Sequence, residues 1–481
     1  MIALTAAELA ALVDGALVGH VDRDALVSGP VVIDSRLAEP GAVFVALRGE
    51  HLDGHDYAAA AVDAGARVVL TERVLAGASG ALPCIVVTEV AGALGALARG
   101  VLTRLRGRGA DADGREAAAP VVVGVTGSVG KTTTKDLLAQ LLSADAPTVA
   151  AAESFNNPIG LPLTVLRADE TTRYLVLEMG ASGVGHIAEL TRIARPDVAV
   201  VLAVGHAHLA GFGGIDAVAR TKAEIVRALT PQGVAVLNAD DPRVAEMAGV
   251  APGRVVTFGT SQTADVQARD VRVDRAGRAS FILATPSATA PVRLRLVGDH
   301  HVTNALAAAA VALELGVALE DVAVRLGAAE ALSAHRMHVV DRVDGVTVLD
   351  DSYNANPDSM RAALKALATI AGRDRRSVAV LGEMLELGAG SRDEHDAIGC
   401  LLVDLGIGLA VVVGAGAGAI ADGAGRAGPA GGDVRRVEDV VAAGALLQAE
   451  LRPGDVVLVK SSHGAGLWRL ADELVGTEDR P

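Results

Sequence analysis

Aromatic side chains are scarce in this sequence. They make up 2% of its 481 residues, and acidic residues outnumber basic ones so that the formal net charge is −15. Proteins that bind nucleic-acid strands usually offer basic grooves and stacking rings, so both shortages argue against a nucleic-acid partner. With 51% hydrophobic residues, the chain has enough apolar material to exclude disorder as a whole. Its length predicts about three domains.

Cysteine and long apolar runs are also lacking. Cys84 and Cys400 are too few for a disulfide framework or a four-thiolate zinc site, and we interpret both as small buried residues in a reducing compartment. The N-terminus has no basic start and carries Glu8, unlike a signal peptide. The longest uncharged stretch, 405–421, is rich in glycine and predicts a buried strand over 409–413 and a turn, rather than a membrane span. We therefore expect a cytoplasmic protein without membrane insertion.

The hydrophobic patterns predict an α/β protein of three domains, over residues 1–112, 113–332 and 333–481. The first ends at a polar, glycine-rich linker over 106–120. In the second and third, Val/Leu strands alternate with helices, which is typical of a parallel sheet covered on both faces. Residues 265–297 instead alternate as antiparallel strands do. The expected strands are 31–33, 43–47, 68–70, 85–88, 121–125, 174–177, 198–204, 234–237, 346–349, 378–381, 410–413 and 456–459, and the expected helices are 57–64, 91–105, 132–142, 216–229 and 302–315.

The strongest motif is VVVGVTGSVGKTTTK, at residues 121–135. A buried strand leads into a glycine-rich turn and then a helix, the arrangement in which backbone N–H groups cradle a polyphosphate. In such a loop Lys131 reaches the β- and γ-phosphates, and the Thr132 hydroxyl is a ligand for Mg²⁺. The strict pattern has glycine at the position of Val125, so this is a variant loop. The motif predicts ATP binding with Mg²⁺.

Other candidate residues follow later strands. Glu178 comes directly after the strand expected over 174–177, where a P-loop protein needs a second Mg²⁺ ligand. His206 and His208 lie in a glycine-rich turn, and Lys222 lies on the helix that follows. A histidine in a turn is usually only a polar loop residue, and a helical lysine is usually solvated. Spacing alone therefore assigns no role to these three.

Several strings occur together and in order: GVTGSVGKTTTK, FNNPIGLPLTVL, EMG, AHLAGFG, KAEI, LNADD, NALAAA and DDSYNANPDSM. With them the chain resembles the Mur ligase family, the ATP-dependent amino-acid and peptide ligases of peptidoglycan precursor synthesis. The resemblance extends from Asp34 to about Trp468. It implies a small UDP-binding domain, a central P-loop ATPase domain and a C-terminal Rossmann-like ligase domain. The more specific strings, FNNPIGLP and DSYNANPDSM, imply UDP-N-acetylmuramoyl-tripeptide and D-alanyl-D-alanine as substrates, and we expect a monomer.

The resemblance also implies roles for single residues. Those that would bind ATP are Thr126, Gly127, Ser128, Val129, Gly130, Lys131, Thr132, Thr133, Asn304, Arg336 and Asp351. The ligands of Mg²⁺ would be Thr132, Glu178, His208 and Lys222, the last as a CO₂-derived carbamate that turns a cation into an anionic oxygen ligand. The catalytic residues would be Lys131, His208, Lys222 and Arg336. The UDP-substrate would contact Ser35, Arg36, Asp53, His55, Asn156 and Asn157.

The implied reaction makes an acyl phosphate from the tripeptide carboxylate and ATP, which the amine of D-alanyl-D-alanine then attacks. Because ATP and Arg336 would lie on different domains, we expect closure about a hinge near 330–335. Three positions depart from the family pattern: Ala203 and His301 replace the usual asparagines, and His463 replaces an arginine.

Other interpretations stay open. One is a different ligase of the same family, such as the enzyme that adds the third peptide residue, or folylpolyglutamate synthase. The asparagine-proline-arginine signature of the third-residue enzyme is not found here, and the UDP-binding strings count against the folate enzyme. A P-loop NTPase acting as a switch or binding module would leave the NANP string at 354–357 unexplained. The glycines of 411–421 fit a tight turn better than an NAD site. The third peptide residue, diaminopimelate or lysine, is not fixed by the sequence.

Overall fold

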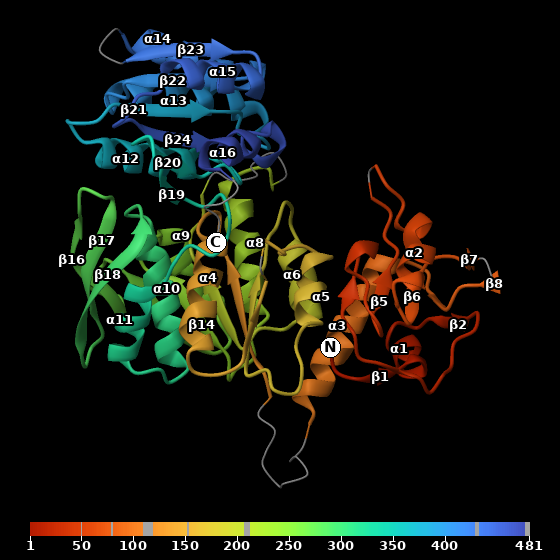
Figure 1. The fold of residues 1–481 in the computed structure, drawn as a ribbon. Coiled ribbons are helices and arrows are strands. Elements are labelled where there is room, and N and C mark those ends of the chain that lie inside the picture. Colours follow the sequence, from red (N-terminus) through yellow and green to blue (C-terminus); the bar gives the residue numbers. More distant parts are fainter. Residues whose placement is uncertain are drawn as a thin grey trace.

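The computed structural model describes residues 1–49, 51–77, 80–108, 119–151, 153–205, 212–428 and 432–476. Three main sheets organise these residues, of five, nine and six strands. In Figure 1 the N-terminal sheet (red and orange) lies at one side of the central one, and the C-terminal sheet (blue) lies above the central one. The predicted α/β class is confirmed.

The N-terminal sheet is covered by helices on both faces. The sheet order is β2-β9-β6-β5-β4, and the strand pairs β1-β3 and β7-β8 lie outside this sheet. The elements of the N-terminal part are β1 (Leu4–Thr5), α1 (Ala6–Leu12), β2 (Ala16–Val18), β3 (Leu26–Val27), β4 (Val31–Val32), β5 (Val43–Val45), α2 (Ala58–Asp63), β6 (Val68–Thr71), β7 (Ala76–Gly77), β8 (Gly80–Ala81), β9 (Cys84–Val86) and α3 (Val90–Arg106). Val43 and Val45 of β5 pack in the core that includes α1 and α3, whereas Phe44 packs in the core that includes α2. The period of two along a strand divides the side chains in this way.

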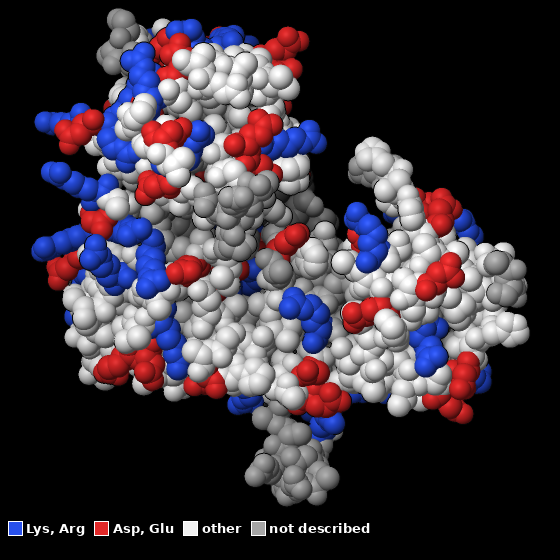
Figure 2. All heavy atoms as spheres, in the orientation of Figure 1, with Lys and Arg blue, Asp and Glu red and all other residues white. Residues whose placement is uncertain are grey.

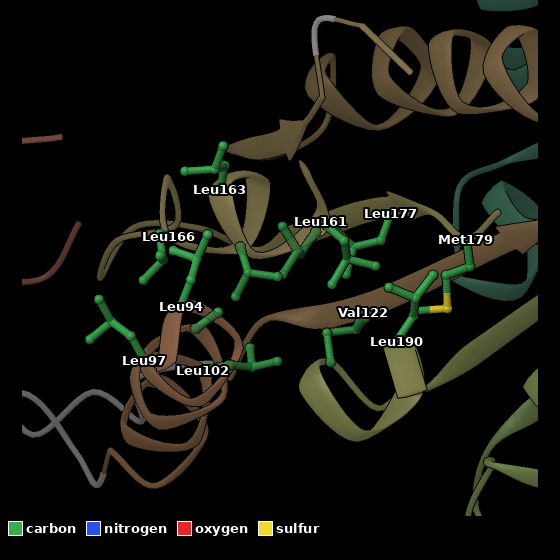
Figure 3. Close-up of a cluster of buried hydrophobic side chains, with 14 of the residues drawn as sticks. Leu94, Leu97, Leu102, Val122, Leu161, Leu163, Leu166, Leu177, Met179 and Leu190 are labelled. Carbon is green, nitrogen blue, oxygen red and sulfur yellow. The ribbon is translucent and has the colours of Figure 1, made fainter. Parts of the chain in front are cut away.

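Helix α3 joins the N-terminal part to the central part through a continuous apolar core. Its Leu94 and Leu102 belong to the same buried cluster as Leu161, Leu177 and Leu190 of the central part. Figure 3 shows these side chains converging between the elements that carry them. Burial, and not the chain connection alone, therefore holds the two parts together.

The central sheet begins parallel and ends antiparallel, in the order β11-β12-β10-β13-β14-β15-β16-β17-β18. Val125 of β10 pairs with Glu178 of β12, so the glycine-rich turn and Glu178 leave the sheet at the same edge. Ligands bind at this edge in parallel α/β sheets. The elements are β10 (Val121–Thr126), α4 (Lys131–Ser143), β11 (Thr148–Ala150), α5 (Gly160–Val165), β12 (Tyr174–Glu178), α6 (His186–Ile193), β13 (Val198–Val201), α8 (Ile215–Arg227), β14 (Val234–Asn238), α9 (Pro242–Ala245), β15 (Arg254–Gly259), β16 (Val266–Val273), β17 (Arg278–Ala284), β18 (Thr289–Val297), α10 (His301–Glu314) and α11 (Leu319–Ala328).

The C-terminal sheet has the order β19-β20-β24-β21-β22-β23. Asp350 of β20 pairs with Val459 of β24, which brings the residues that follow both strands to one edge. Asn356 and Ser359 form a reciprocal cap at the start of the next helix, with proline at its first position. The elements are β19 (His338–Asp341), β20 (Thr347–Asp350), α12 (Pro357–Ala371), β21 (Ser377–Leu381), α13 (Ser391–Asp404), β22 (Leu409–Val413), α14 (Gly418–Ala427), β23 (Asp433–Val437), α15 (Val440–Glu450), β24 (Val456–Lys460) and α16 (Trp468–Val475).

The expected helices and strands are found close to their expected ends. Two expectations differ from the structure, one about the end of a strand and one about the burial of a cysteine. The strand expected over 198–204 ends at Val201, because the backbone beyond it bonds to loops: the Ala203 carbonyl accepts from Ser128 N–H, and Val204 N–H donates to Asp241. Cys84 is buried as expected, but Cys400 is only half-buried.

The remaining expectations concern linkers and membranes. The antiparallel strands expected over 265–297 are β16 to β18. The expected linker begins where α3 ends, but most of it, with the boundary at 112/113, lies outside the described residues. The boundary at 332/333 stays a prediction. In the described parts of the chain, no helix is long and apolar enough to cross a bilayer.

Candidate active site

The glycine-rich turn between β10 and α4 forms one wall of the candidate site. Gly130 has a φ of +83°, and a Cβ there would meet Asn304 Oδ1 at 2.3 Å, so glycine is required by both backbone and space. Helix α4 begins without a side-chain cap, which leaves its first N–H groups free for an anion. Lys131 Nζ donates to the Gly127 carbonyl at 2.8 Å. Its pKa is lowered by burial. The charge of Glu178 opposes this effect, and Arg336 adds a smaller contribution in the lowering direction.

A buried carboxylate lies beside this turn. Glu178 Oε2 accepts from the Thr132 hydroxyl at 2.9 Å, and its Oε1 accepts from Ser154 Oγ at 2.9 Å and from Asn156 Nδ2 at 2.7 Å. Three donors therefore fix the carboxylate of a side chain that is only 1% exposed. A hydroxyl and a carboxylate in contact offer the oxygen ligands that Mg²⁺ prefers, so this donor set fits that ion.

Lys222 of α8 lies at the same cavity and is buried. Among the described residues, its ammonium has neither a hydrogen-bond acceptor nor a carboxylate partner. Its pKa is lowered well below its ordinary value, first by burial and then by the charge of Lys131. A lowered pKa increases the neutral fraction of an amine, and the neutral amine is the form that reacts with CO₂. His206 and His208 lie outside the described residues.

The opposite wall comes from the C-terminal part. The Arg336 guanidinium donates to Thr132 Oγ1 at 3.2 Å and lies 4.1 Å from the ring centre of Tyr353. Asp351 follows β20 and Lys460 is the last residue of the neighbouring β24, and their side chains form an ion pair of 2.5 Å. Burial lowers the pKa of Lys460, although Asp351 opposes this effect.

The two walls enclose a cavity of about 960 Å³. Such a volume accommodates a nucleotide with part of a second substrate. Figure 2 shows basic and acidic side chains interspersed over the outer face. The cations that could bind phosphates are instead gathered inside, where Lys131, Arg336 and Lys460 line the cavity together.

Residues 125–312 match the Mur ligase middle domain, residues 335–463 the Mur ligase glutamate ligase domain, and residues 30–101 the Mur ligase family catalytic domain. A UDP-N-acetylmuramoyl-tripeptide–D-alanyl-D-alanine ligase of Mycobacterium tuberculosis is 48% identical over 510 residues, which cover 99% of each chain. The chain belongs to the Mur ligase family. The predicted family membership is thus confirmed.

Solved Mur ligases have the same fold. The chain is similar to MurF from Acinetobacter baumannii with a TM-score of 0.84 and 33% identity, over 98% of this chain and 99% of that one. It is also similar to MurF ligase from Thermotoga maritima in complex with ADP, with a TM-score of 0.75 and 29% identity, over 93% of this chain and 97% of that one. The curated ligase of the same name from Escherichia coli is 36% identical over 428 residues, which cover 88% of this chain and 89% of that one.

The cavity of this Mur ligase contains nearly all the residues predicted to bind ATP. Thr126 is the exception, since it is buried under the turn and donates to the Met179 carbonyl at 2.8 Å. Asn156 and Asn157, predicted to contact the UDP-substrate, line the same cavity, and Asn156 is bonded to Glu178. The binding roles of all these residues stay predictions.

The other residues predicted to contact the UDP-substrate lie in the N-terminal part, away from the cavity lining. Ser35 and Arg36 occupy a short 3₁₀ turn, where the exposed Arg36 side chain contacts Asp34 at 2.6 Å and lowers the pKa of Asp34 to about 2. Asp53 accepts from the backbone N–H of the buried His55, and its Oδ1 lies 2.5 Å from His55 Nδ1. These contacts lower the pKa of Asp53.

Two features of this Mur ligase were not predicted from the sequence. Ser154, one residue before the FNNPIGLP string, was not predicted to hold Glu178. The Asp351–Lys460 pair was not predicted either, although both residues follow apolar runs, because nothing in the sequence indicates that β20 and β24 are neighbours. An apolar strand ending in a lysine is a signal that could have drawn attention to Lys460.

Proposed function

We propose that this Mur ligase joins D-alanyl-D-alanine to UDP-N-acetylmuramoyl-tripeptide at the expense of ATP, in the cytoplasmic synthesis of peptidoglycan precursors. The observation that carries the proposal is the 48% identity, over 99% of both chains, to a ligase with this name. The cavity supports it, because phosphate-binding, carboxylate and arginine groups from two domains converge there.

In the first step the tripeptide carboxylate attacks the γ-phosphorus of ATP, and ADP leaves. Lys131 and the free N–H groups of α4 would neutralise the charge on the phosphates. Arg336 reaches the same place from the C-terminal part, where its stacking on Tyr353 fixes the plane of the guanidinium. In the second step the amine of D-alanyl-D-alanine attacks the acyl carbon, phosphate leaves with the bonding electrons, and the nitrogen loses a proton. No protein side chain needs to form a covalent bond with substrate.

Mg²⁺ and a carbamate complete the proposed site. Thr132 and Glu178 would hold Mg²⁺, together with His208 and the carbamate of Lys222. The ion would supply positive charge where the phosphate oxygens gather negative charge. The buried ammonium of Lys222, which has no carboxylate partner among the described residues, supports the carbamate, since its conversion to an anion removes a buried cation. We expect the enzyme to act as a monomer.

The competing hypotheses predict different products. A third-residue-adding Mur ligase would extend the dipeptide substrate with one amino acid, and a P-loop switch would hydrolyse ATP without any acceptor. The test supplies ATP and Mg²⁺ with UDP-N-acetylmuramoyl-mono-, di- and tripeptides, each against single amino acids and D-alanyl-D-alanine, and identifies products by mass. We expect only the pentapeptide product from the tripeptide and D-alanyl-D-alanine. A product from the dipeptide, or ATP hydrolysis without a product, contradicts the proposal.

A further inference from the structure

One face of α4 carries three polar side chains at successive turns, and each of them bonds to the segment that leads into the C-terminal domain. Gln140 Nε2 donates to the Glu330 carbonyl at 2.9 Å, and Gln140 Oε1 accepts from Glu330 N–H at 3.0 Å. One turn earlier, Asp136 Oδ2 accepts from Ser333 N–H at 3.2 Å. One turn earlier again, Thr132 Oγ1 accepts from Arg336 at 3.2 Å. The spacing of four along α4 keeps all three on one side.

Within a few residues, the hydrogen-bond partners of this segment change from the central domain to the C-terminal domain. Glu330 and Ser333 are bonded to the central domain through α4. His335 Nδ1 lies 2.7 Å from Asp350 Oδ2, in the C-terminal domain. The bonding partner therefore changes between Ser333 and His335, and His335 has a positive φ of 59°. Arg336 lies just beyond the last bond to α4 and contacts both domains.

We propose that Gln140 and Asp136 are positioning residues, which fix the linker in register on α4 so that the Arg336 guanidinium meets Thr132 beside the P-loop. Neither side chain reaches a substrate, and each acts through the arginine. A shift of the linker by one residue along α4 would carry the guanidinium away from Thr132. An error of about 1 Å in such a group can cost about a hundredfold in rate.

The energetic cost of Asp136 supports a role beyond folding. Its carboxyl is buried, and burial raises its pKa although Lys135 lies 2.6 Å away. A buried ion pair is weak evidence for stability, because desolvation offsets the attraction. Lys135 does, however, contact Asp136 Oδ1, and this contact fixes the carboxylate whose Oδ2 accepts from Ser333 N–H.

The test is a double-mutant cycle between Gln140 and Arg336. We expect Gln140→Ala to lower kcat by about ten- to a hundredfold, with the KM values of the two peptide substrates unchanged. In an Arg336→Ala background the same substitution should change kcat less than twofold, because the group that it positions is gone. The matched control is Gln267→Ala, since Gln267 is also half-buried and its amide bonds to two carbonyls of a loop in the central domain. This control should change kcat less than twofold.

A second pair of variants separates the effect of the hydrogen-bond acceptor of Asp136 from the effect of its negative charge. Asp136→Asn and Asp136→Ala both remove the charge beside Lys135, but only asparagine keeps an oxygen for Ser333 N–H. We expect the asparagine variant to be the faster by at least about tenfold. Equal rates for these two variants, or the same loss from Gln140→Ala in both arginine backgrounds, would overturn the inference.

The inference rests on the proposed function for its kinetic readout, and the two can fail separately. Wild-type enzyme that makes pentapeptide, with additive losses in the cycle, contradicts the positioning role and leaves the function standing. If wild-type enzyme makes no pentapeptide, the function fails, and the same cycle is measured as ATP affinity by titration calorimetry. Coupling between Gln140 and Arg336 in that affinity then supports the positioning role, and its absence overturns it.

Discussion

The lysines that line the two walls of the cavity have different partners. On the C-terminal wall, Lys460 is neutralised within the protein by Asp351, 2.5 Å away. On the central wall, and among the described residues, Lys131 donates to a backbone carbonyl alone and Lys222 has no acceptor. Burial lowers the pKa of all three. The lysine of the C-terminal wall is therefore neutralised as folded, whereas the lysines of the central wall leave positive charge for a ligand to neutralise.

The choice of cation sharpens this comparison. The chain has 38 arginines but only five lysines, and Lys365 is the only lysine with an exposed side chain. Arginine remains charged at every relevant pH, while burial can change the charge of lysine. Four of the five lysines thus lie at enclosed positions, where the ammonium is compact and its pKa can be changed by burial.

The largest expected difference is between Lys131→Met and Lys460→Met. Loss of Lys131 should lower kcat by about 10²–10³-fold, because phosphate charge loses one preorganised cation. It should lower the urea midpoint of unfolding less than loss of Lys460 does, since the Lys131 ammonium is desolvated and no described carboxylate lies within ion-pair distance of it, although the charge of Glu178 favours its charged form. Loss of Lys460 leaves Asp351 unpaired in a largely buried place, and should cost about 3–5 kcal/mol of unfolding free energy. Circular dichroism in urea and steady-state kinetics measure the two effects.

The conservative exchange in both variants supplies the control, because methionine keeps much of the length and apolar surface of lysine. Equal losses of stability would contradict the comparison. So would a Lys131 variant that retains wild-type kcat.

The same contrast explains how much could be predicted from the sequence. The central wall lies on short local strings, so the P-loop, Glu178 and most of the residues that line the cavity there can be picked out from the sequence alone. The family strings also placed Arg336 on the opposite wall. What could not be predicted is contact between strands far apart in the chain, such as the ion pair of Asp351 with Lys460. Strand order in a parallel sheet is decided by packing of the whole domain, and a single sequence carries no local signal for it.

Lys222→Ala gives the next largest effect. Without the lysine the proposed carbamate cannot form, and we expect a loss of about 10–100-fold in activity, the range seen when the support of a metal site is weakened. Added bicarbonate should not restore activity, because the attachment point is missing, whereas a small carboxylic acid such as propionate should restore part of it. Activity is measured against Mg²⁺ concentration. Rescue by bicarbonate, or no effect of the substitution, would show that Lys222 supplies no anionic ligand.

The smallest effect concerns His301, a buried residue at the start of α10 that lines the cavity. Its pKa lies well below the ordinary value of 6.5, first through burial and then through the neighbouring His300. Below pH 6.5 the unfolded chain binds a proton that the folded chain does not, so stability is full above that pH and falls as the pH decreases. The slope for one such group is at most about 1.4 kcal/mol per pH unit.

Replacement by the asparagine usual in the family should remove this slope. The urea midpoints of wild type and His301→Asn are measured at pH 7.5, 6.5 and 5.5. If the wild type is the more stable at pH 7.5, the two midpoints should converge as the pH falls. The control is His20→Asn, because His20 is exposed. Carboxylates titrate alike in all three proteins and cancel in the difference. If the urea midpoints of wild type and His301→Asn instead changed in parallel with pH, His301 would be protonated in the folded state. The start of α10 would then tolerate a buried positive charge.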